Sequence, residues 1–143
     1  MKWLLTRYKN KKPDIEIGEN YLSRWYLVPR NRLFNIYLHR YRGSDDDRAL
    51  HDHPWVSLSY LISGDLYEHD TGGCKYLKSG AWRFRRSTYA HRLEIASKRS
   101  DVWTLFLTGP RIRHWGFHCP KGWVPWEKFT DSTGTRVGRG CEE

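Results

Sequence analysis

The chain has 143 residues and a net charge of +9, from 25 lysines and arginines against 16 aspartates and glutamates. This length fits one domain, which can bury a core without needing disulfides or a structural metal. Its apolar runs are much shorter than the roughly 20 residues that cross a bilayer, so no transmembrane helix is expected. The sequence therefore predicts one domain over residues 1–143.

The N-terminal segment and the cysteines both favour the cytoplasm. Charged residues in the stretch 7–12 follow the first leucines, where a signal peptide needs its apolar segment. The cysteines are an odd, widely spaced set without a CxxC pair, at Cys74, Cys119 and Cys141. This usage is typical of reduced thiols, so we expect a cytoplasmic protein without disulfides.

The positive charge allows two kinds of partner, an anionic small molecule or a nucleic acid. The basic residues are scattered in short clusters at 9–12, 83–86 and 111–114, and they form neither one basic tract nor a known nucleic-acid motif. Charge alone does not choose between these partners, and plain solubility is a third interpretation. Nucleic acid is therefore a possible partner that no motif supports.

Strand-like runs follow one another along the chain, and helical periodicity is scarce. Residues 21–28 and 33–39 are rich in aromatic and β-branched side chains, as buried strands are. After a polar loop, further strand-like runs occupy residues 55–62, 66–68, 80–84, 91–95 and 102–108. Turn signals separate these runs at intervals typical of a sandwich or barrel. The sequence therefore predicts an all-β architecture.

Turns and the C-terminal part complete this prediction. Gly64 and Asp65 form a candidate tight hairpin turn, which would return residues 66–68 antiparallel to the preceding strand. The aromatic segment 115–126 is interrupted by glycine and proline, and we expect it to pack as a lid over one barrel end without a regular element. Residues 131–143 lack apolar anchors and are predicted to be a mobile tail.

His51 and His53 are separated by one residue, in the run His51-Asp52-His53. Residues i and i+2 of a strand point to the same face, so both imidazoles would project together, as a metal site needs. Asp47 and Arg48 precede them closely and are candidates to orient a ligand imidazole through its other nitrogen. The alternative is a pair of exposed or hydrogen-bonded histidines.

The region from 43 to 91 resembles the cupins, small jelly-roll barrels with two histidine motifs. The first motif matches at Gly43, His51, His53 and Gly64, with Ser57 at the position of its usual glutamate. The second motif places a histidine eleven positions after a glycine, as Gly80 and His91 do here. More broadly, residues 24–129 look like cupins of bacteriophages and bacteria related to cysteine dioxygenase. The resemblance implies one cupin jelly-roll domain.

The departures from the cupin pattern shape the expected site. Ser57 removes the glutamate ligand, and Arg86 and Thr88 replace the proline and glycine of the second motif. The resemblance then implies a three-histidine site, similar to the iron site of thiol dioxygenases, formed by His51, His53 and His91. Fe(II) is the expected metal, and Zn, Ni, Mn or Cu would also suit imidazole ligands.

Glu68 and several arginines are the remaining candidates. If Gly64 and Asp65 are the two turn residues, position 61 pairs with 68, which sends Glu68 to the face of the histidines as a reserve ligand or acid–base group. A shift of one residue would instead put it in solvent. The candidates for holding a substrate carboxylate or phosphate are Arg83, Arg85 and Arg92. A solvated basic strand is their alternative.

Two functional hypotheses follow. In the first, the chain is a non-haem Fe(II)-dependent dioxygenase of a small thiol- or carboxylate-bearing molecule. In the second, it is a non-catalytic cupin module that binds a sugar, nucleotide or nucleic acid through aromatic and basic side chains. A metal-assisted isomerase or hydrolase on the same scaffold is a weaker third, because fold does not fix reaction. The resemblance to cupins also suggests a homodimer.

Overall fold

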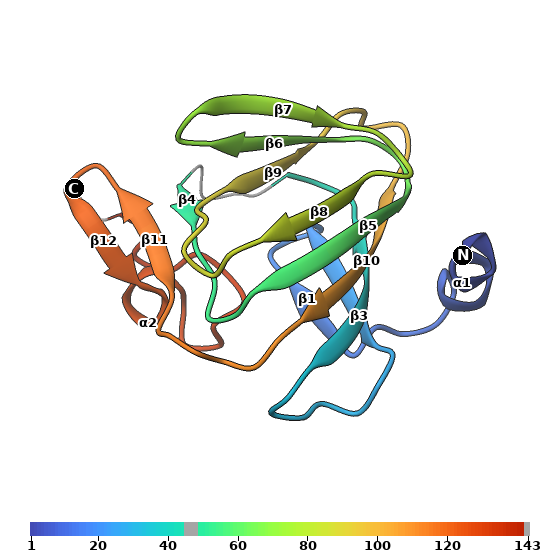
Figure 1. Cartoon of the computed structure of the whole chain (residues 1–143), viewed down its shortest axis with the longest axis horizontal. Helices are drawn as coiled ribbons and strands as arrows, with labels where there is room; N and C mark the ends of the chain where they lie inside the picture. The colour runs from blue at the N-terminus through green and yellow to red at the C-terminus, as the bar shows by residue number, and fades with distance from the viewer. Residues whose placement is uncertain (45–48, 142–143) are drawn as a thin grey trace.

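The structure is a computed structural model that describes residues 1–44 and 49–141, and strands dominate it (Figure 1). Its elements in chain order are α1 (Lys2–Tyr8), β1 (Ile15–Ile17), β2 (Leu22–Tyr26), β3 (Asn35–Tyr41), β4 (Leu50–His51), β5 (Ser57–Ser63), β6 (Leu66–Asp70), β7 (Gly73–Leu77), β8 (Trp82–Arg85), β9 (Arg92–Ile95), β10 (Val102–Thr108), β11 (Gly116–Cys119), β12 (Gly122–Pro125) and α2 (Trp126–Phe129). The predicted strands are confirmed with small shifts of their ends, and the all-β prediction is confirmed with them.

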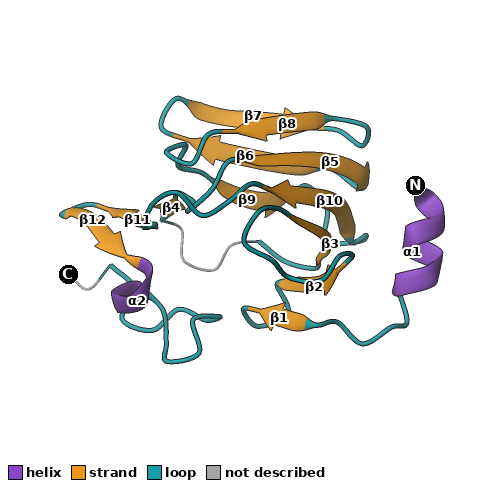
Figure 2. Cartoon of the chain, turned by 60° about the horizontal axis from the view of Figure 1, so that its bottom comes forward, coloured by secondary structure: helices purple, strands orange, loops and turns teal. Residues whose placement is uncertain are grey.

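The described strands form three antiparallel sheets. The largest has the order β1-β2-β3-β10-β5-β8, a second has the order β7-β6-β9, and a third has the order β12-β11-β4. The β7-β6-β9 sheet lies against one half of the large sheet, and the β11-β12 hairpin stands at the end of the molecule opposite α1 (Figures 1 and 2). His51 ends β4, His53 follows two residues after it, and His91 directly precedes β9.

Buried apolar side chains join the two larger sheets. One cluster contains members from both of them, namely Leu22, Tyr41, Leu61, Leu66, Leu93, Ile95 and Val102. A second cluster lies on the outer face of the large sheet, where α1 covers it, and consists of Leu4, Trp25, Leu38, Ile62 and Trp103. Since burial of apolar surface is the main favourable term in folding, these clusters fix how the sheets pack.

Strand β3 shows how the sequence pattern produces both faces. Tyr37, His39 and Tyr41 alternate along it and point into the space between the sheets. Leu38 points the other way and is 0% exposed, because α1 and Trp25 cover that face. Because both of its faces are covered, β3 is a nearly continuous run of buried residues.

The predicted hairpin at Gly64 is wrong in its pairing. Strand β6 pairs with β7 and β9, and Leu61 pairs with Thr104 of β10. The physical reason is that both edges of β5 are already occupied, by β10 and β8, so the chain has to cross to the other sheet. Gly64 makes this crossing with φ of 82°, and an added Cβ would lie 2.9 Å from the Asp101 carbonyl oxygen.

The aromatic segment 115–126 also differs from its prediction. It forms the β11–β12 hairpin, since Gly116 and Gly122 stand at the strand starts and leave the pairing intact. The expectation of no disulfide is wrong as well, because Cys119 of β11 is bonded to Cys141. The two are 22 residues apart in sequence, and the turn of the chain after α2 brings them together.

In the structure the predicted tail is attached to α2 by backbone hydrogen bonds and to this hairpin by the disulfide. The amides of Gly138 and Gly140 both donate to the Phe129 carbonyl, and Thr130 forms a bridge with Val137. The mobility of residues 131–143 in solution stays a prediction. In the described ranges, no helix has the length and apolar character that a membrane crossing requires.

Candidate metal centre

The backbone brings the two histidine motifs together. His51 ends β4, and its amide donates to the His91 carbonyl at 2.9 Å while the His91 amide donates to the His51 carbonyl at 3.0 Å. The amide of His53 donates to the carbonyl of Ser87, which lies within the second motif, at 3.0 Å. The separation of forty residues between His51 and His91 is thus closed by one antiparallel bridge.

The three imidazoles form a triangle. Each pair of rings, among His51, His53 and His91, has its centroids 5.0 Å apart. One nitrogen of each ring lies within 4.8 Å of the others, so the three histidines are positioned to bind a metal. Three convergent imidazoles are a common donor set for Fe, Zn, Ni and Cu.

The environment keeps two of these histidines, His53 and His91, uncharged. Burial lowers the pKa of His91 to about 4, and the nearby His51 and Arg85 also lower it, although the hydrogen bond to Glu68 acts in the opposite direction. Burial of the His53 ring likewise lowers its pKa well below the ordinary value, helped by His51 and His91. Neutral imidazole is the form that binds a metal.

Glu68 orients the His91 ring through a hydrogen bond to Nδ1. Its side chain is fully buried at 0% exposure, and its Oε2 atom lies 2.7 Å from Nδ1 of His91. This contact makes Nδ1 the protonated nitrogen and leaves Nε2 as the one with a lone pair for a metal. Burial raises the pKa of Glu68, but the His91 hydrogen bond and the Arg85 charge outweigh it, so the pKa is low and the group is ionised.

Asp52 fixes the loop between the two histidines of the first motif. Its carboxylate is 2% exposed and accepts the Gly116 amide at 2.9 Å. It also accepts Trp123 Nε1 at 3.0 Å and pairs with Arg113 at 2.9 Å. Burial raises the pKa of Asp52, yet the hydrogen bond from Arg113 and the others lower it overall. The middle residue of the HxH run is therefore the anchor of β4 to the β11–β12 hairpin.

A cavity of about 450 Å³ opens in front of the three histidines. Aromatic side chains form much of its wall, among them Trp55, Phe106 and Phe117. Six arginines line it, at positions 24, 30, 83, 85, 111 and 136, and no aspartate or glutamate is among the described lining residues. The space beside the candidate metal centre is therefore apolar in its walls and positive in its charge.

Arg24 is one of the cavity residues that the sequence analysis did not select. Its Nε donates to Nε2 of His39 at 2.9 Å, and its guanidinium carbon lies 4.5 Å from the ring centroid of Tyr37. Burial lowers the pKa of His39, and the charge of Arg24 lowers it further, so His39 stays neutral. The side-chain partner of Arg24 is therefore a neutral imidazole, and in the part of the chain that the structure describes Arg24 has no ion pair with a carboxylate.

Thr104 stands beside this pair in the sheet. It lies directly opposite His39 in register, is 5% exposed and lines the cavity. Its Oγ1 has no hydrogen-bond partner among the described residues. For Arg24 and His39, the signal in the sequence was strand alternation, which puts both side chains on the inner face. The pairing of β2 with β3, which brings them together, was not visible from the sequence.

The predicted substrate-binding arginines fall into two groups. Arg83 and Arg85 line the cavity, and both donate to Glu68, through Arg83 Nη2 at 2.6 Å and Arg85 Nε at 2.6 Å. Arg92 lies opposite His69 on the outward row of β9, because Leu93 and Ile95 take the inner row. Asp47 and Arg48 lie outside the described residues.

The prediction for Glu68 is altered by this geometry. The side chain does face the interior, although the predicted pairing that would send it there does not form. Its carboxylate is saturated by His91, Arg83 and Arg85, and it is not in the cluster of candidate ligand atoms. The structure therefore places Glu68 against a metal-binding histidine candidate and not among the candidate ligands themselves.

Comparison with solved structures identifies the fold. A protein from Klebsiella pneumoniae with a double-stranded β-helix domain matches with a TM-score of 0.58 and 14% identity, over 72% of this chain and 89% of that one. A cupin superfamily protein from Desulfitobacterium hafniense matches with a TM-score of 0.53 and 16% identity, over 67% and 84%. Fe(II)-HppE matches with a TM-score of 0.53 and 16% identity, over 66% and 52%.

No protein-family model and no curated protein sequence matches this chain. The resemblance to cysteine dioxygenase stays a prediction, while the likeness to solved structures establishes the architecture. The chain therefore has the double-stranded β-helix fold of the cupins.

Proposed function

We propose that this chain is a metal-dependent cupin enzyme, a non-haem Fe(II) dioxygenase of a small anionic molecule that bears a thiol or a carboxylate. The observation that carries the proposal is the cluster of His51, His53 and His91, whose ligand nitrogens lie within 4.8 Å of one another. The solved structure of Fe(II)-HppE, which has a similar fold, supports iron as the metal.

The residues present fit a divalent metal ion. His91 is oriented by Glu68, and Nδ1 of His53 is buried without a hydrogen-bond partner among the described residues. The lowered pKa values of His53 and His91 keep these two donors in the neutral form that binds a metal. A bound Fe(II) would supply a Lewis-acidic and redox-active centre with coordination positions left over for reactants.

Arginines select the substrate class. Glu68 offers one negative charge to both Arg83 and Arg85, so this group keeps a net positive charge. Arg24 adds a second cation from β2, near enough to His53 to lower the pKa of that histidine. A guanidinium presents paired donors that match a carboxylate or phosphate. A small anion would therefore be held close to the three histidines.

Aromatic rings line the wall beside the three histidines. The ring of His53 lies 5.1 Å from that of Trp55, and the ring of Trp55 lies 5.5 Å from that of Phe106. On the hairpin side, the ring centroid of Phe117 lies 5.9 Å from that of His51. Exclusion of water strengthens the electrostatic interactions of the arginines and protects reactive species from side reactions.

Oxygen consumption tests this proposal. Fe(II)-loaded protein is screened against small thiols and carboxylates, and the responsive substrate is then measured with Arg24→Gln. Loss of one charge-assisted contact, worth about 1.5–3 kcal/mol, should raise KM roughly 10- to 100-fold. Arg92→Gln is the matched control, because it removes the same charge on the outward row of β9. Absence of oxygen uptake across the panel, or equal effects of both variants, would contradict the proposal.

A further inference from the structure

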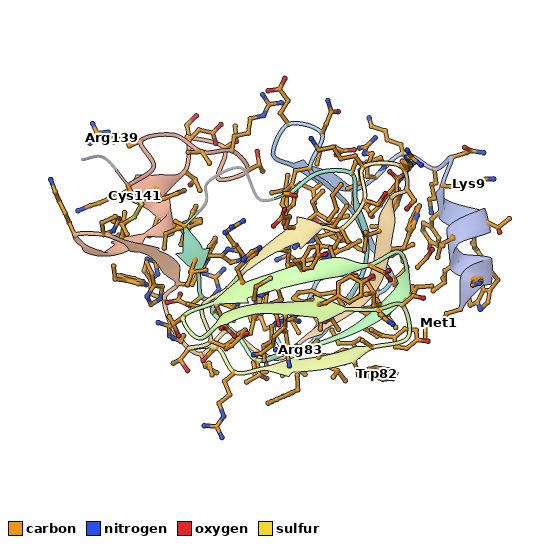
Figure 3. The ribbon with its side chains drawn as sticks, turned by 90° about the horizontal axis from the view of Figure 1, so that it is seen from above. Met1, Lys9, Trp82, Arg83, Arg139 and Cys141 are labelled. Atoms are coloured by element: carbon orange, nitrogen blue, oxygen red, sulfur yellow. A yellow bond between two sulfur atoms is a disulfide. The ribbon has the colours of Figure 1, made fainter. Side chains whose placement is uncertain are left out.

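The C-terminal segment 130–141 forms one wall of the cavity. The residues of this segment that line it are Thr130, Thr133, Gly134, Thr135, Arg136 and Val137. The segment follows α2 and returns to β11, at the end of the molecule where Cys141 is seen (Figures 1 and 3). A solute that approaches the three histidines from this side has to pass it.

The residue that precedes the segment, Phe129, is packed in the protein interior. Phe129 is 1% exposed and stacks on Phe117, with the ring centroids 3.7 Å apart. Phe117 in turn contacts the ring of His51. The base of the wall is therefore part of the packing around the candidate metal centre, and it belongs to the third buried cluster of the molecule.

Beyond residue 130 the attachment is lighter. None of residues 131–141 is buried. Backbone hydrogen bonds run from Gly138 and Gly140 back to Phe129, and Gly18 donates to Thr135 at 2.7 Å. The covalent attachment of the far end is the disulfide between Cys119 and Cys141. Segments with few buried contacts open most readily, and the disulfide adds a covalent restraint to the backbone hydrogen bonds that hold this wall.

We propose that segment 130–141 is a lid over the cavity, and that the Cys119–Cys141 disulfide clamps it and controls access to the three histidines. The inference rests on the proposed function for its purpose, since access matters because a substrate has to reach the metal. Closing the loop between positions 119 and 141 removes open conformations of the segment.

A dithiol reductant opens the clamp by exchange. One thiolate of the reductant attacks a sulfur of the disulfide and releases the other cysteine as a thiolate, which takes up a proton. The second thiolate of the reductant then displaces the first cysteine. Two electrons pass to the protein, which gains two thiols, and the reductant becomes a cyclic disulfide.

Histidine labelling measures this access directly. The full-length chain, kept in a chelator so that no metal shields the rings, is treated with diethyl pyrocarbonate, and each histidine is followed by peptide mass spectrometry. The double variant Cys119→Ser/Cys141→Ser should label His51, His53 and His91 severalfold faster than wild type. His114, whose side chain is 49% exposed, should label at one rate in both proteins.

Two further samples separate the clamp from general damage. Cys74→Ser removes the exposed free cysteine and should label like wild type. Wild type that has been reduced and desalted should label like the double variant, and reoxidation should restore slow labelling. Equal labelling of the cavity histidines in all samples overturns the inference, and so does a parallel rise at His114 or a failure of reoxidation to restore protection.

The labelling result is independent of metal binding. A chain that binds no metal yet shows the clamp-dependent rates contradicts the proposed function alone. A chain that binds metal but labels equally with and without the disulfide contradicts the lid alone.

Discussion

Glu68 is the residue on which the candidate site is most dependent. One fully buried carboxylate serves His91, Arg83 and Arg85 together, so its negative charge both orients an imidazole and balances two guanidiniums. Removing one member of a buried ion pair leaves the other charges without compensation, which costs far more than the loss of an exposed pair.

Glu68→Gln should therefore weaken both stability and metal binding. We expect a loss of about 3 kcal/mol in the free energy of unfolding, because two arginines lose their counter-charge inside the protein. Metal affinity should fall roughly 10- to 100-fold, because the orienting carboxylate of His91 is gone. Urea unfolding and competitive metal titration measure the two effects.

Glu94→Gln is the control for this change. Glu94 also pairs with a histidine, His69 at 2.7 Å, but its side chain is 44% exposed on the outer face. Its loss should cost less than about 1 kcal/mol and leave metal affinity unchanged. If Glu68→Gln has the same free energy of unfolding and the same metal affinity as this control, the role given to Glu68 is incorrect.

His39 makes stability dependent on pH. It is 1% exposed, and burial followed by the Arg24 charge lowers its pKa well below the ordinary value, so it stays neutral in the folded protein. The unfolded chain takes up a proton as pH falls below about 6.5 while the folded chain does not. Stability is therefore complete above that pH and declines below it, by roughly 1.4 kcal/mol per pH unit for this group.

His39→Gln should make this decline shallower. The glutamine oxygen can still accept the Arg24 hydrogen bond, but the side chain no longer titrates. Since His53 and His91 have lowered pKa values too, part of the decline remains. Urea unfolding between about pH 7 and pH 5 compares wild type with His39→Gln and with the half-exposed control His114→Gln. A slope unchanged in His39→Gln contradicts this assignment.

At the scale of elements, the β11–β12 hairpin holds the HxH loop in place. Gly116 stands where the two meet, since its amide donates to Asp52 and an added Cβ would lie 2.2 Å from the Val124 carbonyl oxygen. That contact is with backbone, which cannot move aside without breaking the pairing of β11 with β12.

Gly116→Ala should consequently disrupt both hairpin and site. We expect a loss of about 3 kcal/mol or more, measured by thermal unfolding, together with weaker metal binding as Asp52 loses its anchor. Gly72→Ala is the comparison, because its added Cβ would meet only the Asp70 side chain, at 3.3 Å. Equal stability of the two variants would show that the hairpin does not constrain the loop.

The sequence predicted elements better than it predicted their partners. The strands around residues 55–62 and 66–68 were found from composition and turn signals, but their pairing was not, because edge occupancy depends on the whole sheet. Although the predicted pairing does not form, Glu68 lies in the interior, because the chain crosses to the other sheet at Gly64. The disulfide was missed for a similar reason, since the approach of Cys141 to Cys119 depends on tertiary packing.

The histidines were the most predictable part of the site. The spacing of His51 and His53 and the second motif at His91 selected all three residues of the candidate metal cluster. Arg24 and His39 lie outside both motifs, and an arginine in a strand is ordinarily exposed, so strand alternation alone did not mark either residue as part of the site. Only the pairing of β2, β3 and β10 places them with Thr104 on the cavity wall.

At the scale of the whole molecule, six of the 25 basic residues line the cavity. Part of the charge of +9 lies in this arginine-lined cavity, which favours a small anion over the extended face that a nucleic acid needs. The same cavity has apolar walls and one cluster of candidate metal ligands among the described residues. The shape and the charge together favour an enzyme pocket over the alternative of a binding module.

Metal content tests the central claim most directly. Protein without an affinity histidine tag is purified without added metal, and wild type is compared with His51→Ala, His91→Ala and the outer-face control His69→Ala. About one iron per chain in wild type and in the control, lost in the other two variants, is the predicted result. No bound metal even after anaerobic Fe(II) addition, or equal metal in all four proteins, would contradict the account and leave ligand or nucleic-acid binding as the better explanation.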